Sequence, residues 1–250
     1  MIMHINFERG ADLFAGGFLN SLERTLSAGR WQMFLDGMLV TIQISLGAVL
    51  VGLVIGSIIA YFKLSRSKVL RALAFIYLGV IRGTPSVTQI LLVGSIIFAG
   101  FRGNGVWIGV VALGINSGAY VAEIIRAGIM SIDKGQREAG LSLGFTPVQT
   151  MVYIIMPQAV KNIIPTFVNE FIVLIKETAI VGFVAVADVT RVAMQLQTRT
   201  MDIMPLVVSG VMYLTLISAL TALLTFAEKR LRAADGDAPA LKKARTRKEG

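Results

Sequence analysis

The chain has 250 residues, of which 55% are hydrophobic and 16% charged, whereas charged residues make up about 25% of a soluble domain. A mean hydropathy of +0.72 and a formal net charge of +9 accompany this composition, which excludes a disordered chain, a collagen-like chain and an ordinary soluble enzyme. With no cysteine and one histidine, His4, thiolate chemistry, a histidine-based triad and a multi-histidine metal site are excluded, so we expect no catalytic or metal-binding residue.

Five stretches of the sequence are long and apolar enough to cross a membrane, because a spanning helix needs about 20 mostly apolar residues. They are residues 33–62, 70–100, 106–129, 150–187 and 203–228. The fourth stretch is too long for one straight helix and contains Pro157 and Pro165, which predict a kink or two parts. The sequence therefore predicts an all-α, polytopic membrane protein with a transmembrane domain over residues 31–230.

The distribution of Lys and Arg predicts how these stretches are oriented. Basic residues are concentrated in the first and third connections and in the tail, and they are sparse elsewhere. Basic residues favour the cytoplasmic side, so we expect the N-terminus outside and the C-terminus in the cytoplasm. They also suit contact with anionic membrane lipid, which accounts for the net charge without nucleic acid.

The two ends of the chain differ from the rest in composition. Residues 1–30 form an external leader without the features of a cleavable signal peptide. Within it, residues 7–30 predict either an interfacial amphipathic helix or an irregular segment. Residues 231–250 are charged and poor in large apolar side chains, which predicts a disordered basic tail in the cytoplasm.

Residues 131–157 predict a short cytoplasmic helix, about 133–144, between the third and fourth stretches. Asp133 is expected to cap its N-terminus with Gln136 as the capping-box partner, and Gly144 to take the left-handed position after its end. Thr146 and Pro147 then restart the chain as a second cap and a first helical residue.

Such a helix is well shaped to dock into a groove on another protein. The polar side chains that we expect on its surface are Arg137, Glu138 and Ser142.

The same segment resembles the EAA motif of ABC-importer permeases. That motif reads Glu-Ala-Ala, three residues, Gly, nine residues, Ile, one residue and Leu-Pro. The matching residues here, at the same spacing, are Glu138-Ala139-Gly140, Gly144, Ile154 and Met156-Pro157. Gly140 replaces Ala and Met156 replaces Leu, and both replacements keep a small or an apolar residue.

Other stretches resemble the polar amino-acid branch of that superfamily, the histidine, glutamine and arginine permeases, over most of residues 35–230. They are Arg82-Gly83-Thr84-Pro85 with Gln89, residues 116–129, Lys134-Gly135-Gln136, Pro157-Gln158-Ala159, Asn169 with Phe171 and Ile172, and Lys176-Glu177-Thr178, where Glu replaces the family's Asp.

The resemblance implies the fold of a type I ABC importer permease, with about five spans, in a bacterial inner membrane. It implies a pair of permease subunits, identical or similar, that work with a separate ATP-binding subunit and an external solute-binding protein. The short helix would couple to the ATPase through Glu138, Ala139, Gly140 and Gly144. Independently of the resemblance, the chain has no Gly-Lys pair and so no P-loop, and we expect it to hold no cofactor while the partner subunit binds ATP.

Polar groups inside a membrane are costly, so they are the first candidates for a substrate site. Gly83-Thr84-Pro85 is expected to break the second stretch, with Thr84 capping a new helix that begins at Pro85. A helix N-terminus favours an anion, and every amino acid carries an α-carboxylate. We therefore expect Arg82, Thr84 and Gln89 near a carboxylate site. The alternatives are that Arg82 snorkels or pairs with an acid and that Thr84 is only a cap.

Two further pairs of residues each share one face of a helix, because the members of each pair lie seven positions apart. The pairs are Asn116 with Glu123 and Glu170 with Glu177. Asn116 is expected to bind polar groups of the substrate or to bond across helices. Glu123 is expected either to attract a substrate ammonium or cationic side chain, or to pair with Arg126. In the fourth stretch, Glu177 is the preferred acidic contact and Glu170 the weaker one, and an ion pair across a dimer is the alternative.

The sequence thus predicts a permease subunit of an ATP-driven importer that moves a polar amino acid by alternating access. The main alternative is an ion-coupled secondary amino-acid transporter with Glu123 and Glu177 as coupling carboxylates. A membrane assembly factor without transport is a second alternative. Nucleic-acid binding is disfavoured, because the basic tail lies at the lipid surface.

Overall fold

The computed structural model describes residues 17–98 and 105–234, with side chains described as far as residue 226. The longer helices are α2 (Arg30–Leu64), α3 (Lys68–Gly83), α5 (Val106–Met130), α8 (Met156–Glu177), α9 (Val189–Thr200) and α10 (Met204–Ala234). The shorter ones are α4 (Ser86–Leu92), α6 (Lys134–Ser142) and α7 (Pro147–Thr150). Two π-helical turns, η1 (Val93–Ile97) and η2 (Met151–Ile155), and a 3₁₀ helix, η3 (Thr178–Val184), continue them. The described part of the chain contains no strand, which agrees with the predicted all-α class.

Each of the five predicted stretches is occupied by a helix or a run of helices. Among the described residues, α2, α5 and α10 are long and apolar enough to cross a membrane, and the bent pair α3 with α4–η1 makes a fourth candidate. The fourth stretch forms a continuous helical run from α7 through η3. Charged and polar side chains, Lys161, Glu170, Lys176 and Glu177 among them, explain why apolarity alone does not identify α8 as a span.

The ends of the chain are only partly described. Residues 17–26 are helical, so part of the predicted leader forms a helix, while residues 1–16 lie outside the described residues. The predicted disordered tail is corrected at its start, because α10 continues to Ala234. Leu, Arg and Ala are good helix formers and prolong the helix. The rest of that tail, residues 235–250, is also outside the described part.

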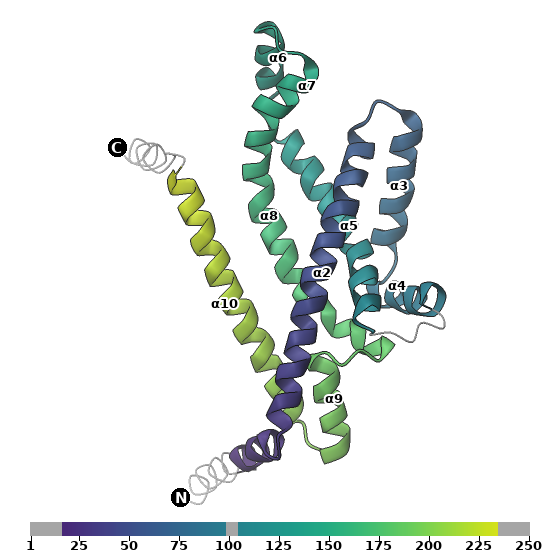
Figure 1. Ribbon diagram of the computed structural model, residues 1–250, viewed down its shortest axis with the longest axis vertical. Helices are drawn as coiled ribbons and strands as arrows, with labels where there is room; N and C mark the ends of the chain where they lie inside the picture. Colours follow the sequence, from purple (N-terminus) through teal and green to yellow (C-terminus); the bar gives the residue numbers. More distant parts are fainter. Residues whose placement is uncertain (1–16, 99–104, 235–250) are drawn as a thin grey trace, which may run out of the picture.

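Helices α2 and α5 run side by side in the same direction and form the centre of the bundle (Figure 1). Their contact depends on glycine. A Cβ atom added at Gly56 would lie 2.6 Å from Val121 Cγ1, and one added at Gly114 would lie 2.6 Å from Val51 Cγ1. Side chains do not approach so closely, so larger residues would push the helices apart. Small residues serve this purpose in membranes, where lipid gives packed helices no hydrophobic advantage.

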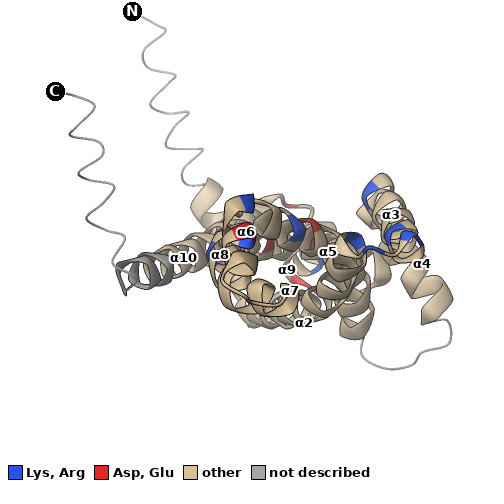
Figure 2. Cartoon of the chain, turned by 90° about the horizontal axis from the view of Figure 1, so that it is seen from above, with Lys and Arg blue, Asp and Glu red and all other residues tan. Residues whose placement is uncertain are grey.

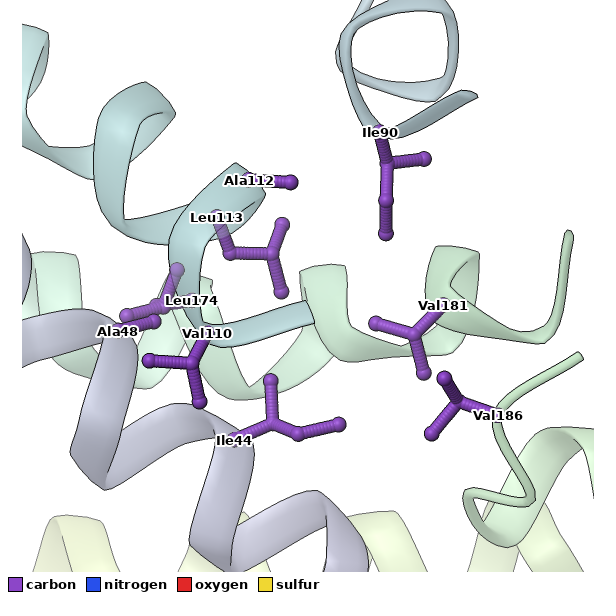
Figure 3. Close-up of a cluster of buried hydrophobic side chains, with 9 residues drawn as sticks. All are labelled: Ile44, Ala48, Ile90, Val110, Ala112, Leu113, Leu174, Val181 and Val186. Carbon is purple, nitrogen blue, oxygen red and sulfur yellow. The ribbon is translucent and has the colours of Figure 1, made fainter. Parts of the chain in front are cut away.

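The second stretch is broken after Gly83, as predicted, and the chain turns by 107° between α3 and the α4–η1 segment. Helix α4 therefore lies across the bundle while α3 runs along it (Figure 1). Ile90 of α4 is fully buried in the central hydrophobic cluster, whose members come from α2, α4, α5, α8 and the η3 region (Figure 3). This cluster fixes the crosswise segment against the long helices.

Helix α9 was not predicted from the sequence. Asp188 caps it by accepting hydrogen bonds from the backbone N–H groups of Arg191 at 2.9 Å and Thr190 at 3.1 Å. The Tyr213 hydroxyl of α10 also donates to Asp188, at 3.1 Å. Val189 and its neighbours on α9 pack on Phe34 of α2, so α9 joins the first turns of α2 to the start of α10.

The helix at residues 17–26 is tied to the turn between α9 and α10. The Ser21 hydroxyl donates to the Asp202 carboxylate, and the Met204 N–H donates to the same group at 2.9 Å. These hydrogen bonds, that from Ser21 foremost, hold the pKa of Asp202 below its usual range. The leader helix is therefore positioned against the end of the bundle that carries α9.

Replacing Gly56 with Ala should destabilise the protein by about 1–3 kcal/mol, the usual cost of overpacking, because the new methyl group meets Val121 and the backbone of Ala122. The midpoint of unfolding in a denaturing detergent, measured on the purified protein, would report the loss. Gly79→Ala on α3 is the matched control, since nothing lies within 4 Å of its added Cβ. Equal midpoints for the two variants would contradict the role of the α2–α5 contact.

Candidate functional site

A chain of polar side chains connects the break between α3 and α4 to the middle of α5. The Asn116 amide donates to Gln89 Oε1 at 2.9 Å. The Gln89 amide in turn donates to Thr84 Oγ1 at 2.8 Å and to the Ile81 carbonyl at 2.7 Å. Three predicted site residues, Thr84, Gln89 and Asn116, are thus brought together although they come from three different elements.

The prediction that Thr84 caps the new helix is wrong. Its hydroxyl donates back to the Val80 carbonyl at 2.8 Å and so closes the end of α3. Pro85 occupies the capping position of α4, which begins at Ser86 and has no side-chain cap. The Thr84 backbone is extended, with φ −122° and ψ 148°, and in this conformation its hydroxyl turns toward the preceding helix rather than the following one.

Two carboxylates of α8 lie on the other side of α5. Ser117, the neighbour of Asn116, is within 3.5 Å of Glu170 Oε1 and donates to it. Glu177 lies seven residues further along α8 on the same face, and neither carboxylate forms an ion pair among the described residues. Lys176 is exposed on the other face of the helix. Of the two carboxylates, Glu170, the weaker candidate from the sequence, is therefore the one hydrogen-bonded to the residue next to Asn116.

Glu123 and Arg82 belong to a separate, charged cluster. Glu123 is paired with Lys63 of α2, with Arg126 Nε at 2.8 Å and with Arg82 Nη1 at 3.6 Å. The Arg82 guanidinium also lies 5.9 Å from the centre of the Tyr120 ring. Of the alternatives left open by the sequence, the pairing of Glu123 with Arg126 and that of Arg82 with an acid are both confirmed.

The six predicted substrate residues therefore form three groups rather than one. Sequence reasoning missed Lys63, Ser117 and Tyr77, whose hydroxyl donates to the Ile115 carbonyl at 2.5 Å. Ser117 carried a signal, since it is adjacent to Asn116 in a segment singled out by resemblance. Lys63 and Tyr77 carried none, because their partners lie on another helix.

The short helix α6 has the ends that the sequence predicted, with one exception. Asp133 caps it by accepting from the Gly135 N–H at 2.7 Å. Gly144 has φ +83°, and the backbone N–H groups of Gly144 and Phe145 donate to the carbonyls of Leu141 and Gly140, the pattern of a Schellman end. Gln136 is not a capping-box partner; its side-chain oxygen accepts instead from Gln158 of α8 at 3.4 Å.

The segment after α6 restarts as predicted. Thr146 and Gln149 form a complete capping box at the start of α7, with Pro147 in the first turn. Gly140 is buried, and a Cβ atom there would lie 2.7 Å from Thr150 Cγ2 and 2.8 Å from Ile154 Cδ1. The glycine that replaces the alanine of the EAA motif therefore sets how closely α6 packs on η2. Of the four predicted coupling residues, Gly140 is therefore buried and packs inside the segment, so it does not belong to the exposed surface.

The outer surface of α6 and the following turn is open. Glu138, Ala139 and Gly144 are exposed, as are the predicted Arg137 and Ser142. Large apolar side chains stand among them, with Leu143 77% and Val148 72% exposed. Figure 1 shows this segment at the far end of α8, projecting beyond the other helices. An exposed surface that mixes apolar and charged groups suits a protein partner.

Replacing Gln89 with Leu should loosen the crosswise segment, because the buried Asn116 amide and the Ile81 carbonyl lose their partner. Each unpaired buried group costs about 1–3 kcal/mol. Hydrogen exchange of residues 84–97 should become faster, and the unfolding midpoint should fall. Thr88→Val is the control on the same helix, because Thr88 is exposed. Unchanged exchange in Gln89→Leu would show that the polar chain does not hold α4.

Comparison with known proteins places the chain in a family. Residues 52–233 match the family described as the binding-protein-dependent transport system inner membrane component. The arginine transport system permease protein ArtQ of Bacillus subtilis (strain 168) is 40% identical over 204 residues, 80% of this chain and 93% of that protein. The glutamine transport system permease protein GlnP of Escherichia coli (strain K12) is 33% identical over 206 residues, again 80% and 93%.

Solved structures agree with the sequence comparison. An amino acid ABC transporter crystallised with histidines superimposes with a TM-score of 0.76 at 41% identity, over 85% of this chain and 98% of that one. An inward-facing MetNI methionine ABC transporter shares the fold, with a TM-score of 0.68 at 18% identity over 84% and 99% of the two chains. The fold is thus that of ABC importer permeases, and the chain belongs to the family of inner-membrane components of binding-protein-dependent transport systems.

Proposed function

We propose that this chain carries a polar amino acid across the inner membrane as the permease subunit of an ATP-driven importer. Family membership supports a multi-pass membrane subunit that leaves ATP hydrolysis to a separate chain, as does the lack of a P-loop. Arginine and glutamine permeases among its relatives support a polar amino acid as substrate. None of these findings supports the ion-coupled alternative.

The single observation that carries the proposal is the projecting segment α6–α7. It stands clear of the bundle, with Glu138 and Leu143 exposed, while its buried Gly140 packs on Thr150 at the start of the fourth helical run. Viewed from this end, the backbone of charged residues, coloured blue and red, is seen on and around α6 (Figure 2). We propose that the ATP-binding subunit docks here and that α6 transmits its motion. This places α6 and the C-terminus in the cytoplasm and the N-terminus outside, where a solute-binding protein delivers the substrate.

The polar groups on either side of α5 supply a place for an amino acid. The amides of Gln89 and Asn116 and the hydroxyl of Thr84 offer hydrogen bonds for an α-carboxylate. The carboxylates of Glu170 and Glu177 offer a negative region for an α-ammonium or a cationic side chain. Arg82 and Glu123 contact each other within a cluster that also holds Lys63 and Arg126, so we assign them no direct substrate contact. A cationic group of the substrate at Glu170 or Glu177 would compensate a carboxylate charge that has no ion pair among the described residues.

Transport by this chain requires a second permease subunit, which we propose is a second copy or a similar chain. Apolar side chains are exposed over much of the bundle, with Phe75 of α3 77% and Leu214 of α10 66% exposed. Lipid and the twin subunit together would cover these surfaces. Alternating access then follows if the paired bundles have two packings that ATP binding and substrate bias differently.

Reversing the charge at Glu138 should weaken assembly with the ATP-binding subunit, because Glu138 lies on the open surface of α6. Co-purification of the subunit with Glu138→Arg should fall several-fold, while the permease remains folded. Glu23→Arg is the matched control, since Glu23 is equally exposed but lies on the leader helix. Unchanged assembly and unchanged ATP-coupled transport in Glu138→Arg would remove the coupling role of α6.

Uptake into liposomes that contain the permease with its ATP-binding subunit and binding protein should require ATP and persist when ion gradients are collapsed.

Replacing Glu170 or Glu177 with Gln should raise the KM for cationic amino acids more than for neutral ones, because a negative charge near the ammonium is lost. Glu23→Gln should leave the KM for cationic amino acids and the KM for neutral amino acids unchanged. Uptake that follows ion gradients without ATP would favour the secondary transporter, and unchanged constants in both carboxylate variants would reject the site.

A further inference from the structure

The charged cluster around Glu123 contains more positive than negative charge. Lys63, Arg82 and Arg126 come from α2, α3 and α5 and all contact the same carboxylate. One carboxylate balances one cation, so two positive charges remain. Among the residues that the structure describes, no second acidic group pairs with these three. Such a surplus at the edge of a membrane protein attracts an anion.

The sequence around the cluster makes this surplus a property of a large region. Between Asp36 and Asp133 Glu123 is the only acidic residue. The basic residues in that interval are Lys63, Arg66, Lys68, Arg71, Arg82, Arg102 and Arg126. Apart from Asp36, which lies 27 residues before Lys63 near the start of α2, helices α2, α3, α4 and α5 carry no second carboxylate that could balance the remaining charge.

The uncharged runs of α2 and α5 both end at this cluster, and from this we infer that it lies where a bilayer's headgroups begin. Lys63 directly follows the uncharged run 37–62 of α2, and Glu123 directly follows the uncharged run 105–122 of α5. Each run is long enough to fill the hydrocarbon core. Arg82 starts deeper along α3, and its long side chain reaches Glu123, as snorkelling side chains do.

Aromatic side chains mark the same level. Tyr61 precedes Lys63 by two residues and is 67% exposed, and Tyr120 lies beneath the Arg82 guanidinium and is 38% exposed. Tyr is enriched where hydrocarbon meets headgroups, because its ring is apolar and its hydroxyl is not. Basic and aromatic groups therefore occur together at one depth, which is the arrangement that suits a lipid.

The basic groups are open to a ligand from outside the protein. The side chains of Lys63, Arg82 and Arg126 are 33%, 48% and 35% exposed, whereas that of Glu123 is 20% exposed. The carboxylate thus sits inside and the cations surround it on the open side. Behind them, Ala60 and Ala122 close the contact between the helices.

We propose that Lys63, Arg82 and Arg126 form a binding site for the phosphate group of an anionic membrane lipid. Their ammonium and guanidinium groups supply charge-assisted hydrogen bonds that phosphate oxygens accept. Free phosphate has the same chemistry, but exposed apolar side chains of α3 next to Arg82, Ile76 and Val80, give acyl chains a surface. The proposal rests on the chain being a membrane subunit and is independent of the substrate.

The test uses the full-length permease assembled with its ATP-binding subunit in a neutral detergent. Phosphatidylglycerol is titrated in, and retained lipid is counted by native mass spectrometry, with phosphatidylcholine as the neutral lipid. Lys63→Gln or Arg126→Gln should weaken phosphatidylglycerol binding about fivefold, the effect of one basic side chain near an anionic surface. Glu123→Gln should instead strengthen it by a similar factor, because the internal competitor for the same cations loses its charge.

Matched measurements decide between this site and simpler explanations. Arg66→Gln, an exposed basic residue of the α2–α3 turn outside the cluster, should leave binding unchanged. An equal loss in Arg66→Gln, or weaker binding in Glu123→Gln, would overturn the proposal. So would inorganic phosphate displacing the lipid at equal concentration, because the site would then recognise a free anion. Uptake of amino acids is measured separately, so a failure of the lipid site leaves the transport proposal standing.

Discussion

The close packing of α2 on α5 is the constraint on which the rest of the structure depends. Where Gly52 and Gly56 meet α5, the helices approach until backbone and side chains touch, and no larger residue fits there without a shift. This contact sets the rotation of α5 about its axis. Because α5 carries Asn116, Ser117 and Glu123, that rotation decides which neighbours these polar groups meet. In lipid such packing has to come from shape, since burying apolar surface gains little.

A second constraint is that polar groups within a bilayer need partners inside the protein. The chain meets it in separate places. Thr84, Gln89 and Asn116 bond to one another around the break in the second stretch, and Glu123 gathers three cations at the edge of the hydrocarbon. Glu170 accepts a long hydrogen bond of 3.5 Å from Ser117, and neither Glu170 nor Glu177 has an ion-pair partner among the described residues. These two acids, which we assign to the substrate, therefore have carboxylate oxygens that can still take up an incoming cationic group.

Local signals in the sequence predicted much of the local structure, although Thr84 closes α3 instead of capping α4 and Gln136 is not a capping-box partner. The break at Gly83-Thr84-Pro85, the ends of α6 and the capping box at Thr146 depend on residues within a few positions of one another, and all three are present. The 107° turn after α3 was out of reach, because it is set by the burial of Ile90 among side chains from distant segments. Helix α9 was overlooked because its polar residues resemble those of a loop, although Asp188 caps it locally; the further hydrogen bond from Tyr213 depends on the tertiary structure.

The candidate site was predictable in composition but not in grouping. Residue type and depth pointed to Arg82, Glu123 and the polar residues near them, whereas their pairing depends on how α2, α3 and α5 are placed. Lys63 illustrates the difference. In the sequence it reads as the end of a span, and only the three-dimensional contact makes it a partner of Glu123.

The missing side chain at Gly140 has a mechanical consequence. At Gly140, α6 is in direct contact with Thr150 and Ile154. A displacement of the projecting segment is therefore passed on to these two residues with little loss. Both ends of α6 are closed by their own hydrogen bonds, so the segment moves as a unit. The displacement enters the helical run at its first turns, and Glu170 lies 16 residues beyond Ile154, about 24 Å at the usual helical rise. A tilt of α8 that is small beside α6 would move Glu170 and Glu177 through a larger distance.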